Sequence, residues 1–242
     1  MTAPLYVGCA GWSLPREHWP AFLGQGTHLQ RYASRFNAVE INSSFYRPHL
    51  PKTYARWRDS VPAGFRFSVK MPKRITHELR LQQCASALNE FLAQCLQLHE
   101  KLGCLLVQLP PSLSYEPLVA RAFFEALRQG FAGAVVLEPR HASWLAAGSL
   151  LRALEIGWVT ADPDVIAAGD AWHGVRYWRL HGSPRIYHSA YGHERVQAYA
   201  RLLRQSMEEG IPTWCIFDNT ASGHAIADAL DLLDLHRSHL PI

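Results

Sequence analysis

Short apolar runs alternate with longer segments of helical spacing along the whole chain. A short apolar run fits a buried β-strand, and apolar residues that repeat every three or four positions fit a helix covering it. This pattern predicts eight strands, over residues 5–9, 38–42, 65–70, 104–109, 134–138, 157–162, 176–181 and 213–218. It predicts helices over residues 29–36, 51–61, 84–102, 116–129, 145–155, 194–209 and 221–235. The connection 163–175, after the sixth strand, lacks a helical pattern.

The repeat length indicates how these elements are arranged. One strand with its helix takes about 30 residues, the size of a βα unit. The 242 residues of the chain come close to the roughly 250 of an eightfold barrel. The pattern therefore predicts an α/β fold made of a single (β/α)8 TIM-type barrel over residues 1–242, with no regular helix after its sixth strand.

A doubly wound open sheet would give the same alternation of strands and helices. Helices cover both faces of such a sheet, so its strands are apolar throughout, whereas the mouth of a barrel accepts polar side chains on the inward face. The first strand leads into GCAGWS, which lacks the GxGxxG fingerprint of a dinucleotide-binding sheet. The barrel is therefore favoured.

Polar side chains occupy one face of several predicted strands. In 176–181, Trp178 and Leu180 share one face, while Tyr177, Arg179 and His181 share the other. If the helices cover the apolar rows, the polar rows converge in the C-terminal mouth, where barrel enzymes carry their active sites. The polar residues predicted to meet there are Glu40, Asn42, Lys70, Gln108, Glu138, Arg140, Asp162, Arg179 and His181.

Charged residues in one buried place need an explanation, because each costs several kcal/mol unless it is paired. The predicted set holds three carboxylates and three cations. One interpretation is a ligand site in which these groups work on a substrate. The alternative is an ion-pair network that neutralises itself. We favour the ligand site for the set as a whole.

Loops after the second and third strands add candidates. Phe45 and Tyr46 could stack on a sugar or base, or they could simply pack in the core. Lys73, Arg74 and His77 follow Lys70 closely and would form a cationic rim for a phosphate or carboxylate, although a solvated loop would look similar.

Two later segments also face the predicted mouth. The segment 182–192, which carries Tyr191 between two glycines, resembles a mobile lid or a plain surface loop. Asp218 and Asn219 directly precede a helix whose first N–H groups would point toward the mouth. Helix N-termini bind anions, so a phosphate site is predicted here; helix capping by Asn219 is the simpler alternative.

Composition narrows the class of protein. A chain that is 48% hydrophobic and 18% charged can bury a large core, which excludes a disordered protein. No apolar run approaches the roughly 18 residues that a membrane span needs, and the first residues lack the pattern of a signal peptide, so we expect a cytoplasmic protein without membrane contact. Five cysteines without a CxxC pair indicate reduced, buried thiols rather than disulfides or a zinc site.

The source of the positive charge is informative. The net charge is +4, and only four of the 24 basic residues are lysines. Arginine forks suit carboxylate and phosphate, which favours a small anionic ligand, although a GC-rich genome would produce the same bias. The charges are spread along the chain, so no basic nucleic-acid-binding tail is present.

These residues lead to one main hypothesis for the function. It is an enzyme, a hydrolase, lyase or isomerase, that carries out acid–base chemistry on a small phosphorylated or polyhydroxylated anion. Arg140, Arg179 and Lys70 would hold the anion. Proton transfer would fall to Glu40, Glu138 or Asp162 together with His181, while Lys70 could also form a Schiff base unless it pairs with Glu40.

Two alternatives stay open. One is a metal-dependent phosphodiesterase or endonuclease-like enzyme, with a divalent ion held by Glu40, Glu138, Asp162, His181 and Asp218. The three cations in the same mouth would repel such an ion, so we expect neither a metal nor another cofactor. The other alternative is a non-catalytic protein that binds nucleic acid or senses a ligand. The sequence does not predict an oligomeric state.

Seven runs of residues resemble one known family over nearly the whole chain. They are GCAGWS (8–13), VEINSSFYR (39–47), FRFSVKMPKRITHELRL (65–81), LVQLPPS (106–112), EPRHASW (138–144), RLHG (179–182) and FDNTASGHA (217–225). They resemble the YecE-like family, catalogued as domain of unknown function 72. The resemblance implies a TIM-barrel fold and no established reaction. The chain departs from that family at Pro139, where relatives often have Phe, and at Asp218, where they often have Asn.

Overall fold

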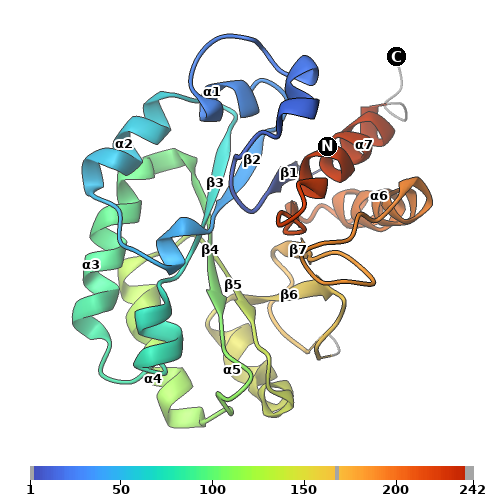
Figure 1. Cartoon of the computed structure of the whole chain (residues 1–242). Coiled ribbons are helices and arrows are strands. Elements are labelled where there is room, and N and C mark those ends of the chain that lie inside the picture. The colour runs from blue at the N-terminus through green and yellow to red at the C-terminus, as the bar shows by residue number, and fades with distance from the viewer. Residues whose placement is uncertain (1–2, 167–168, 238–242) are drawn as a thin grey trace.

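Eight parallel strands form one barrel in the computed structural model, which describes residues 3–166 and 169–237 (Figure 1). The strands are β1 Leu5–Cys9, β2 Ala38–Ile41, β3 Arg66–Lys70, β4 Leu102–Gln108, β5 Ala134–Glu138, β6 Ile156–Asp162, β7 Arg176–Leu180 and β8 Thr213–Phe217. They are hydrogen-bonded in the order β1-β8-β7-β6-β5-β4-β3-β2. The predicted α/β barrel is therefore confirmed, and each predicted strand agrees with the structure within two residues at either end.

Helices surround this barrel, with α2, α3 and α4 along one side and α6 and α7 along the other (Figure 1). They are α1 His28–Tyr32, α2 Pro51–Asp59, α3 Ala85–Cys95, α4 Pro117–Gly130, α5 Gly148–Ala153, α6 His193–Glu208 and α7 His224–Arg237. Short turns of 3-10 helix are η1 Arg16–Ala21, η2 Ser43–Phe45, η4 Leu96–Lys101 and η5 Ala142–Ala147, and η3 Arg74–Glu78 is a π-helical turn. The described residues between β6 and β7 form no helix, as predicted.

Local sequence explains where these helices begin and end. Pro51 and Pro117 occupy the first turn of α2 and α4, where the missing N–H costs nothing. The single long helix predicted over 84–102 is wrong, because His99 has a positive φ of 48° that interrupts helical geometry. The helix predicted over 145–155 is likewise split into η5 and α5.

The barrel closes between β1 and β2 through side chains as well as backbone. The Asn37 amide makes two hydrogen bonds to the backbone of β1, at 2.9 and 2.7 Å. The Tyr32 hydroxyl accepts from the Cys9 N–H at 2.7 Å and donates to the Ala38 carbonyl at 2.9 Å. Gly8 lies at this seam, and a Cβ there would come within 2.0 Å of the Ala38 oxygen. Only glycine therefore allows the two strands to come this close.

The inside of the barrel has two layers. The lower layer is apolar and is built from Ala38, Cys104, Leu106, Val136, Val159, Val175, Tyr177, Trp214 and Ile216. The opposite faces of the same strands, such as Val39, Val69 and Leu180, pack in the core beneath the helices. Above the apolar layer the inward positions are polar, which is the arrangement that the alternating rows predicted.

Two further expectations concern the chain as a whole. All five cysteines are free and buried, as predicted. Among the residues that the structure describes, no helix is both long enough and apolar enough to cross a membrane.

Candidate active site at the mouth of the barrel

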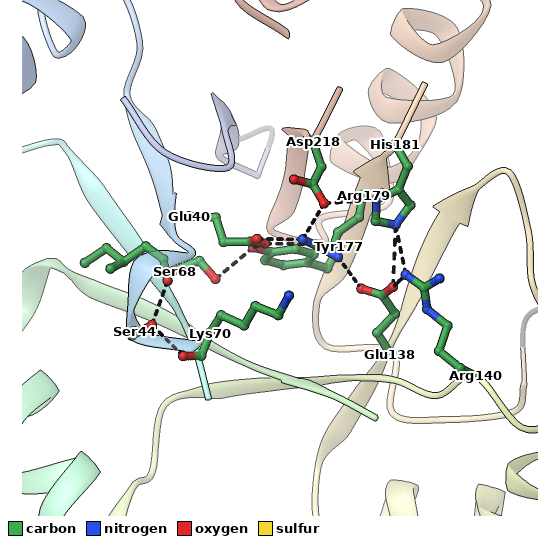
Figure 2. A network of polar contacts seen from close by, with 11 residues as sticks. Glu40, Ser44, Ser68, Lys70, Glu138, Arg140, Tyr177, Arg179, His181 and Asp218 are labelled. Atoms are coloured by element: carbon green, nitrogen blue, oxygen red, sulfur yellow. Dashed lines mark hydrogen bonds and ion pairs between the residues drawn. The ribbon is translucent and has the colours of Figure 1, made fainter. Parts of the chain in front are cut away.

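Arg179, the inward residue near the end of β7, lies at the centre of the mouth (Figure 2). Its guanidinium donates to both oxygens of Glu40, at 3.0 and 2.8 Å. It also donates to Glu138 at 2.6 Å and to Asp218 at 2.8 Å. The side chain is fully buried. Three carboxylates from three strand ends therefore meet on one arginine.

This arrangement changes the role expected for Arg179. Each of its three nitrogens donates to a carboxylate, and no surface is open to a ligand. The expectation that Arg179 holds a substrate anion is therefore not supported. The residue instead neutralises and orients the carboxylates, whose attraction raises the pKa of Arg179 despite its burial.

His181, two residues after Arg179 on the same inward row, lies between two of these carboxylates. Its Nδ1 is 3.0 Å from Asp218 Oδ2, and its Nε2 is 3.5 Å from Glu138 Oε1. Burial alone would lower the pKa of His181, but the contacts with Asp218 and Glu138 outweigh it, and the pKa is raised above its usual value. The raised pKa favours the protonated imidazole, which can donate a proton.

The pKa values of Glu138 and Asp218, the two carboxylates beside His181, are lowered. Burial would raise the pKa of Glu138, yet Arg179, His181 and Arg140 hold it well below the usual value. Burial opposes ionisation of Asp218 as well, but Arg179 and His181 keep its pKa low. Arg140 donates to Glu138 through Nη2, the same nitrogen that lies 3.4 Å from His181 Nε2. Both carboxylates are thus ionised acceptors.

Lys70, at the end of β3, is a cation of the mouth whose ammonium group makes no ion pair with the described residues (Figure 2). Its Nζ lies 4.3 Å from the centre of the Phe45 ring. Among the described residues no carboxylate lies within ion-pair distance of this nitrogen, so the predicted pair with Glu40 is wrong, because Arg179 already occupies both oxygens of Glu40. Burial and the nearby Arg179 lower the pKa of Lys70 to about 8.

We call these seven residues the charge cluster: Glu40, Lys70, Glu138, Arg140, Arg179, His181 and Asp218. Three carboxylates face three permanent or near-permanent cations, so the cluster is neutral when His181 is neutral. Protonation of His181 leaves one positive charge over. The cluster can therefore accept one negative charge from outside when it takes up one proton.

Two polar residues below the cluster were not among the predicted site residues. The Tyr177 hydroxyl lies 2.9 Å from Glu40 Oε2 and 2.7 Å from Ser68 Oγ. Both side chains lie on the inward rows that the sequence pattern identified. Their position in the row was visible in the sequence, but a tyrosine and a serine carry no charge that marks them as members of a network.

Asp162 lies on the other face of its strand, and its predicted place in the mouth is wrong. Its carboxylate accepts two hydrogen bonds from Arg195 at 2.9 Å and one from Tyr199, both on α6. Asp162 pairs in register with Leu180, which packs under the helices, whereas its neighbour Ala161 pairs with Arg179. The alternation of the strand therefore turns Asp162 outward.

Tyr191 and Asn219 hold the segment 182–192 in place instead of lining the mouth. The Tyr191 hydroxyl accepts from the Gly182 N–H at 2.8 Å and donates to the Asp162 carbonyl at 2.9 Å. The Asn219 amide donates to the Ser189 carbonyl at 3.0 Å and to Asp228 at 2.6 Å. Both side chains are buried, so neither supports the predicted role in substrate binding.

The tip of that segment covers His181. The Tyr187 ring packs edge-on against the imidazole, with centres 5.6 Å apart, and its backbone N–H donates to the His181 carbonyl. Tyr187 is itself partly exposed and has a positive φ of 67°. The segment is thus a cover anchored at its base, and its predicted motion remains untested.

The remaining candidates occupy the border of the cluster. Phe45 and His77 pack against each other beside Lys70, with ring centres 4.9 Å apart. Tyr46 is 71% exposed and lines a groove of about 230 Å³ with Lys73 and Arg74, outside the cluster.

Two predicted amides lie at the ends of β2 and β4, the strands on either side of β3. Gln108 pairs in register with Glu138 and shares its inward face. Asn42 follows the last residue of β2, and no hydrogen bond to its side-chain amide is present within the described residues.

The residues do not form an evident metal site. Within the described part of the chain, no group of three or more histidine, cysteine, aspartate or glutamate side chains is placed to hold a metal ion. The carboxylates that such a site would use are instead oriented onto Arg179.

Comparison with known proteins places the chain in a family. Residues 6–240 match the family described as "Protein of unknown function DUF72". The chain is 34% identical over 154 residues to the "UPF0759 protein YecE" of Escherichia coli (strain K12), which is 63% of this chain and 54% of that protein. It is 28% identical over 114 residues to the "UPF0759 protein YunF" of Bacillus subtilis (strain 168), covering 44% and 40%. The chain thus matches about half the length of these curated relatives.

Solved structures agree on the fold. A DUF72 family protein from Enterococcus faecalis V583 superposes with a TM-score of 0.79 at 19% identity, over 99% of this chain and 97% of that chain. One from Thermotoga maritima MSB8 gives 0.72 at 24% identity, over 96% and 99%. At these identities the likeness extends to the barrel alone.

Proposed function

This chain belongs to the DUF72 family, and we propose that its barrel mouth is the active site of an enzyme that transfers protons on a small anionic substrate. One observation carries this proposal. Lys70 is a buried cation without a carboxylate partner among the described residues, in a cluster whose other charges are paired. A buried ammonium without a partner is unfavourable, and an incoming anion would remove that cost.

The geometry supports distinct roles for the two titrating groups. Lys70 would contact the anion in its charged form, and with a pKa of about 8 it can also give up a proton near neutral pH. His181, held between Asp218 and Glu138, would act as the proton donor. A pair of groups with different pKa values in one mouth is what acid–base catalysis requires.

The other charged residues would position these two groups. Arg179 fixes the three carboxylates, and Glu138 and Asp218 fix the imidazole. Because Tyr187 covers His181 from its own side, the anion would enter from the Lys70 side of the mouth.

The experiment compares two lysines that lie three residues apart. Lys70→Met removes the cation in the mouth, and Lys73→Met removes a half-exposed lysine that pairs with Glu78 at 3.3 Å. Calorimetric titration with sulfate, inorganic phosphate and a panel of phosphorylated and carboxylated metabolites measures the affinity. A hydrogen bond to a charged group contributes about 1.5–3 kcal/mol, so Lys70→Met is expected to weaken binding at least about tenfold, and Lys73→Met to leave it unchanged.

Two results would contradict this function. Unchanged affinity in Lys70→Met for every anion that binds the wild type would remove Lys70 from the site. Binding without turnover of any compound in the panel would instead favour a sensor over an enzyme. Incubation of each bound compound with the wild type and with His181→Gln, followed by mass spectrometry, separates these outcomes.

A further inference from the structure

A cavity of about 390 Å³ opens beside the charge cluster, between the loop after β1 and the end of β2. Its lining residues are Ala10, Gly11, Trp12, Ser13, His28, Asn42 and Ser43. We call it the β1–β2 cavity. Its volume falls in the range of about 300–1,000 Å³ typical of small-molecule sites.

The β1–β2 cavity adjoins the charge cluster directly. Ala10 pairs with Glu40 across the barrel seam, and the Gly11 N–H donates to the Glu40 carbonyl at 2.9 Å. Ile41 pairs in register with Val69, so the next residues, Asn42 and Lys70, end their strands side by side. A ligand in this cavity would therefore lie next to the Lys70 side of the cluster.

The chemistry of the lining differs from that of the cluster. It contains no Asp, Glu, Lys or Arg, and it offers the indole of Trp12, the hydroxyl of Ser13 and the amide of Asn42. The Ser43 hydroxyl also lines the cavity and already pairs with His49 Nε2 at 2.8 Å, so it has one remaining position for a ligand. Trp12 is held by an edge-on contact with Trp57, with ring centres 5.0 Å apart. Such a lining suits an uncharged group with an apolar face and several hydroxyls.

One residue of the lining has unused hydrogen-bonding capacity, and another leaves open space beside its backbone. Oδ1 of Asn42 is buried, and within the described residues it has no hydrogen-bond partner, which is a cost that a ligand donor would relieve. At Gly11 a Cβ would meet no atom within 4 Å, so its backbone faces open space. Its φ of 104° also favours glycine, which leaves the backbone accessible.

We propose that the β1–β2 cavity binds a neutral, polyhydroxylated ring, such as a pyranose or cyclitol, that forms one end of the substrate. The inference deepens the proposed function, because the anionic group of the same molecule would lie on Lys70. Hydroxyls around the ring would pair with Asn42, Ser13 and Ser43, and the apolar face of the ring would lie against Trp12. The substrate class is then a ring polyol that carries one anionic group.

The test uses uncharged probes, so it does not depend on the anion. Saturation-transfer NMR with glucose, ribose and myo-inositol is recorded on the wild type, Asn42→Ala and Trp12→Leu. Gln25→Ala, an amide removed from an exposed loop, is the matched control. Loss of one neutral hydrogen bond predicts about two- to tenfold weaker polyol binding in Asn42→Ala, with unchanged sulfate affinity.

The outcomes separate the two proposals. If the wild type binds none of the polyols, or if Asn42→Ala and Trp12→Leu bind them as the wild type does, the polyol site is overturned even where sulfate still binds through Lys70. If polyols bind and depend on Asn42 while no anion binds, the proposed function fails and the polyol site stands. Binding of uridine or adenosine while the polyols stay inert would overturn the polyol site in favour of a nucleobase site.

Discussion

Two neighbouring parts of the same barrel mouth are built on opposite principles. The charge cluster is closed, because its carboxylates meet on a fully buried arginine. The β1–β2 cavity is open and its lining carries no acidic or basic side chain other than the exposed His28. Two groups with unused bonding capacity, the ammonium of Lys70 and Oδ1 of Asn42, lie where the two parts meet, and a third, Nε of Arg140, lies within the cluster.

This difference separates structural charge from functional charge. Paired groups such as Arg179 and Glu40 cannot bind a ligand without breaking strong contacts, so they act as a rigid support. We call Arg179 and its three carboxylate partners, Glu40, Glu138 and Asp218, the platform. The density of charge in a mouth therefore does not identify the ligand contacts. Under the proposed function, the ligand contacts are instead the unsatisfied groups at the border of the platform, Lys70 and Asn42.

The largest expected effect comes from breaking the platform. Arg179→Met leaves three buried carboxylates without their shared partner, and the loss of one member of a buried ion pair costs about 3–5 kcal/mol. Urea denaturation followed by circular dichroism measures the free energy of unfolding. Arg195→Met is the control, because its ion pair with Asp162 is partly exposed and contributes about 1 kcal/mol or less. Equal losses in the two variants would contradict the platform.

Two aspartates, at the ends of the strands on either side of β7, test how the platform controls His181. Asp218→Asn removes a negative charge 3.0 Å from the imidazole and is expected to lower the pKa of His181, because that contact favours the protonated ring. Asp162→Asn removes a charge that faces α6 and is expected to leave that pKa unchanged. Titration of the imidazole nitrogens by NMR measures both. A similar shift in both variants would mean that long-range charge, and not the direct contact, sets the pKa.

The Asp218→Asn variant also changes the charge balance of the cluster. It removes one of the three carboxylates that face Lys70, Arg140 and Arg179. With two carboxylates against three cations, protonation of the imidazole becomes less favourable. Asp218→Asn thus tests whether this acid sets the pH range over which His181 titrates.

Much of this arrangement was predictable from the sequence because strand geometry is regular. A period of two assigns Arg179 and His181 to one face and Leu180 to the other, and the structure keeps that assignment. The prediction that Asp162 lies in the mouth was wrong, because it was based on the position of Asp162 at a strand end and not on the face of the strand that Asp162 occupies. Its alternation with Ala161 would have turned it outward.

Other features depend on contacts between distant segments, which no local pattern contains. The sequence does not show that both oxygens of Glu40 go to Arg179 and leave Lys70 without a carboxylate. It does not show that Tyr191 bonds to the backbone beneath it. The β1–β2 cavity is likewise invisible in the sequence, because it forms between the loop after β1 and the end of β2, which are distant in the sequence.

The pH dependence of anion binding tests Lys70, at the border of the platform. The expected change in affinity is smaller than the loss of stability expected for Arg179→Met. Sulfate keeps its charge across the range, so any change comes from the protein. Its affinity is expected to fall as pH rises through the raised pKa of His181, above 6.5, and again near 8 as Lys70 loses its proton. The loss between pH 7 and 9 is roughly tenfold, the size of one charged hydrogen bond. Calorimetry measures it, and Lys70→Met should flatten the step near 8.

The smallest effect is expected on the open side of the mouth. Asn42→Ala removes a side-chain amide that has no hydrogen bond among the described residues, together with a buried oxygen that is unsatisfied. Removing an unsatisfied polar atom costs little and can stabilise, so the free energy of unfolding is expected to change by less than about 1 kcal/mol. The same urea titration used for Arg179→Met measures this change, and Gln25→Ala in an exposed loop sets the baseline. A loss of the size expected for Arg179→Met would show that Asn42 holds the mouth together, and the contrast between a closed platform and an open cavity would then fail. An unchanged free energy of unfolding, together with weaker polyol binding, would show that Asn42 contributes to ligand binding and not to the stability of the fold.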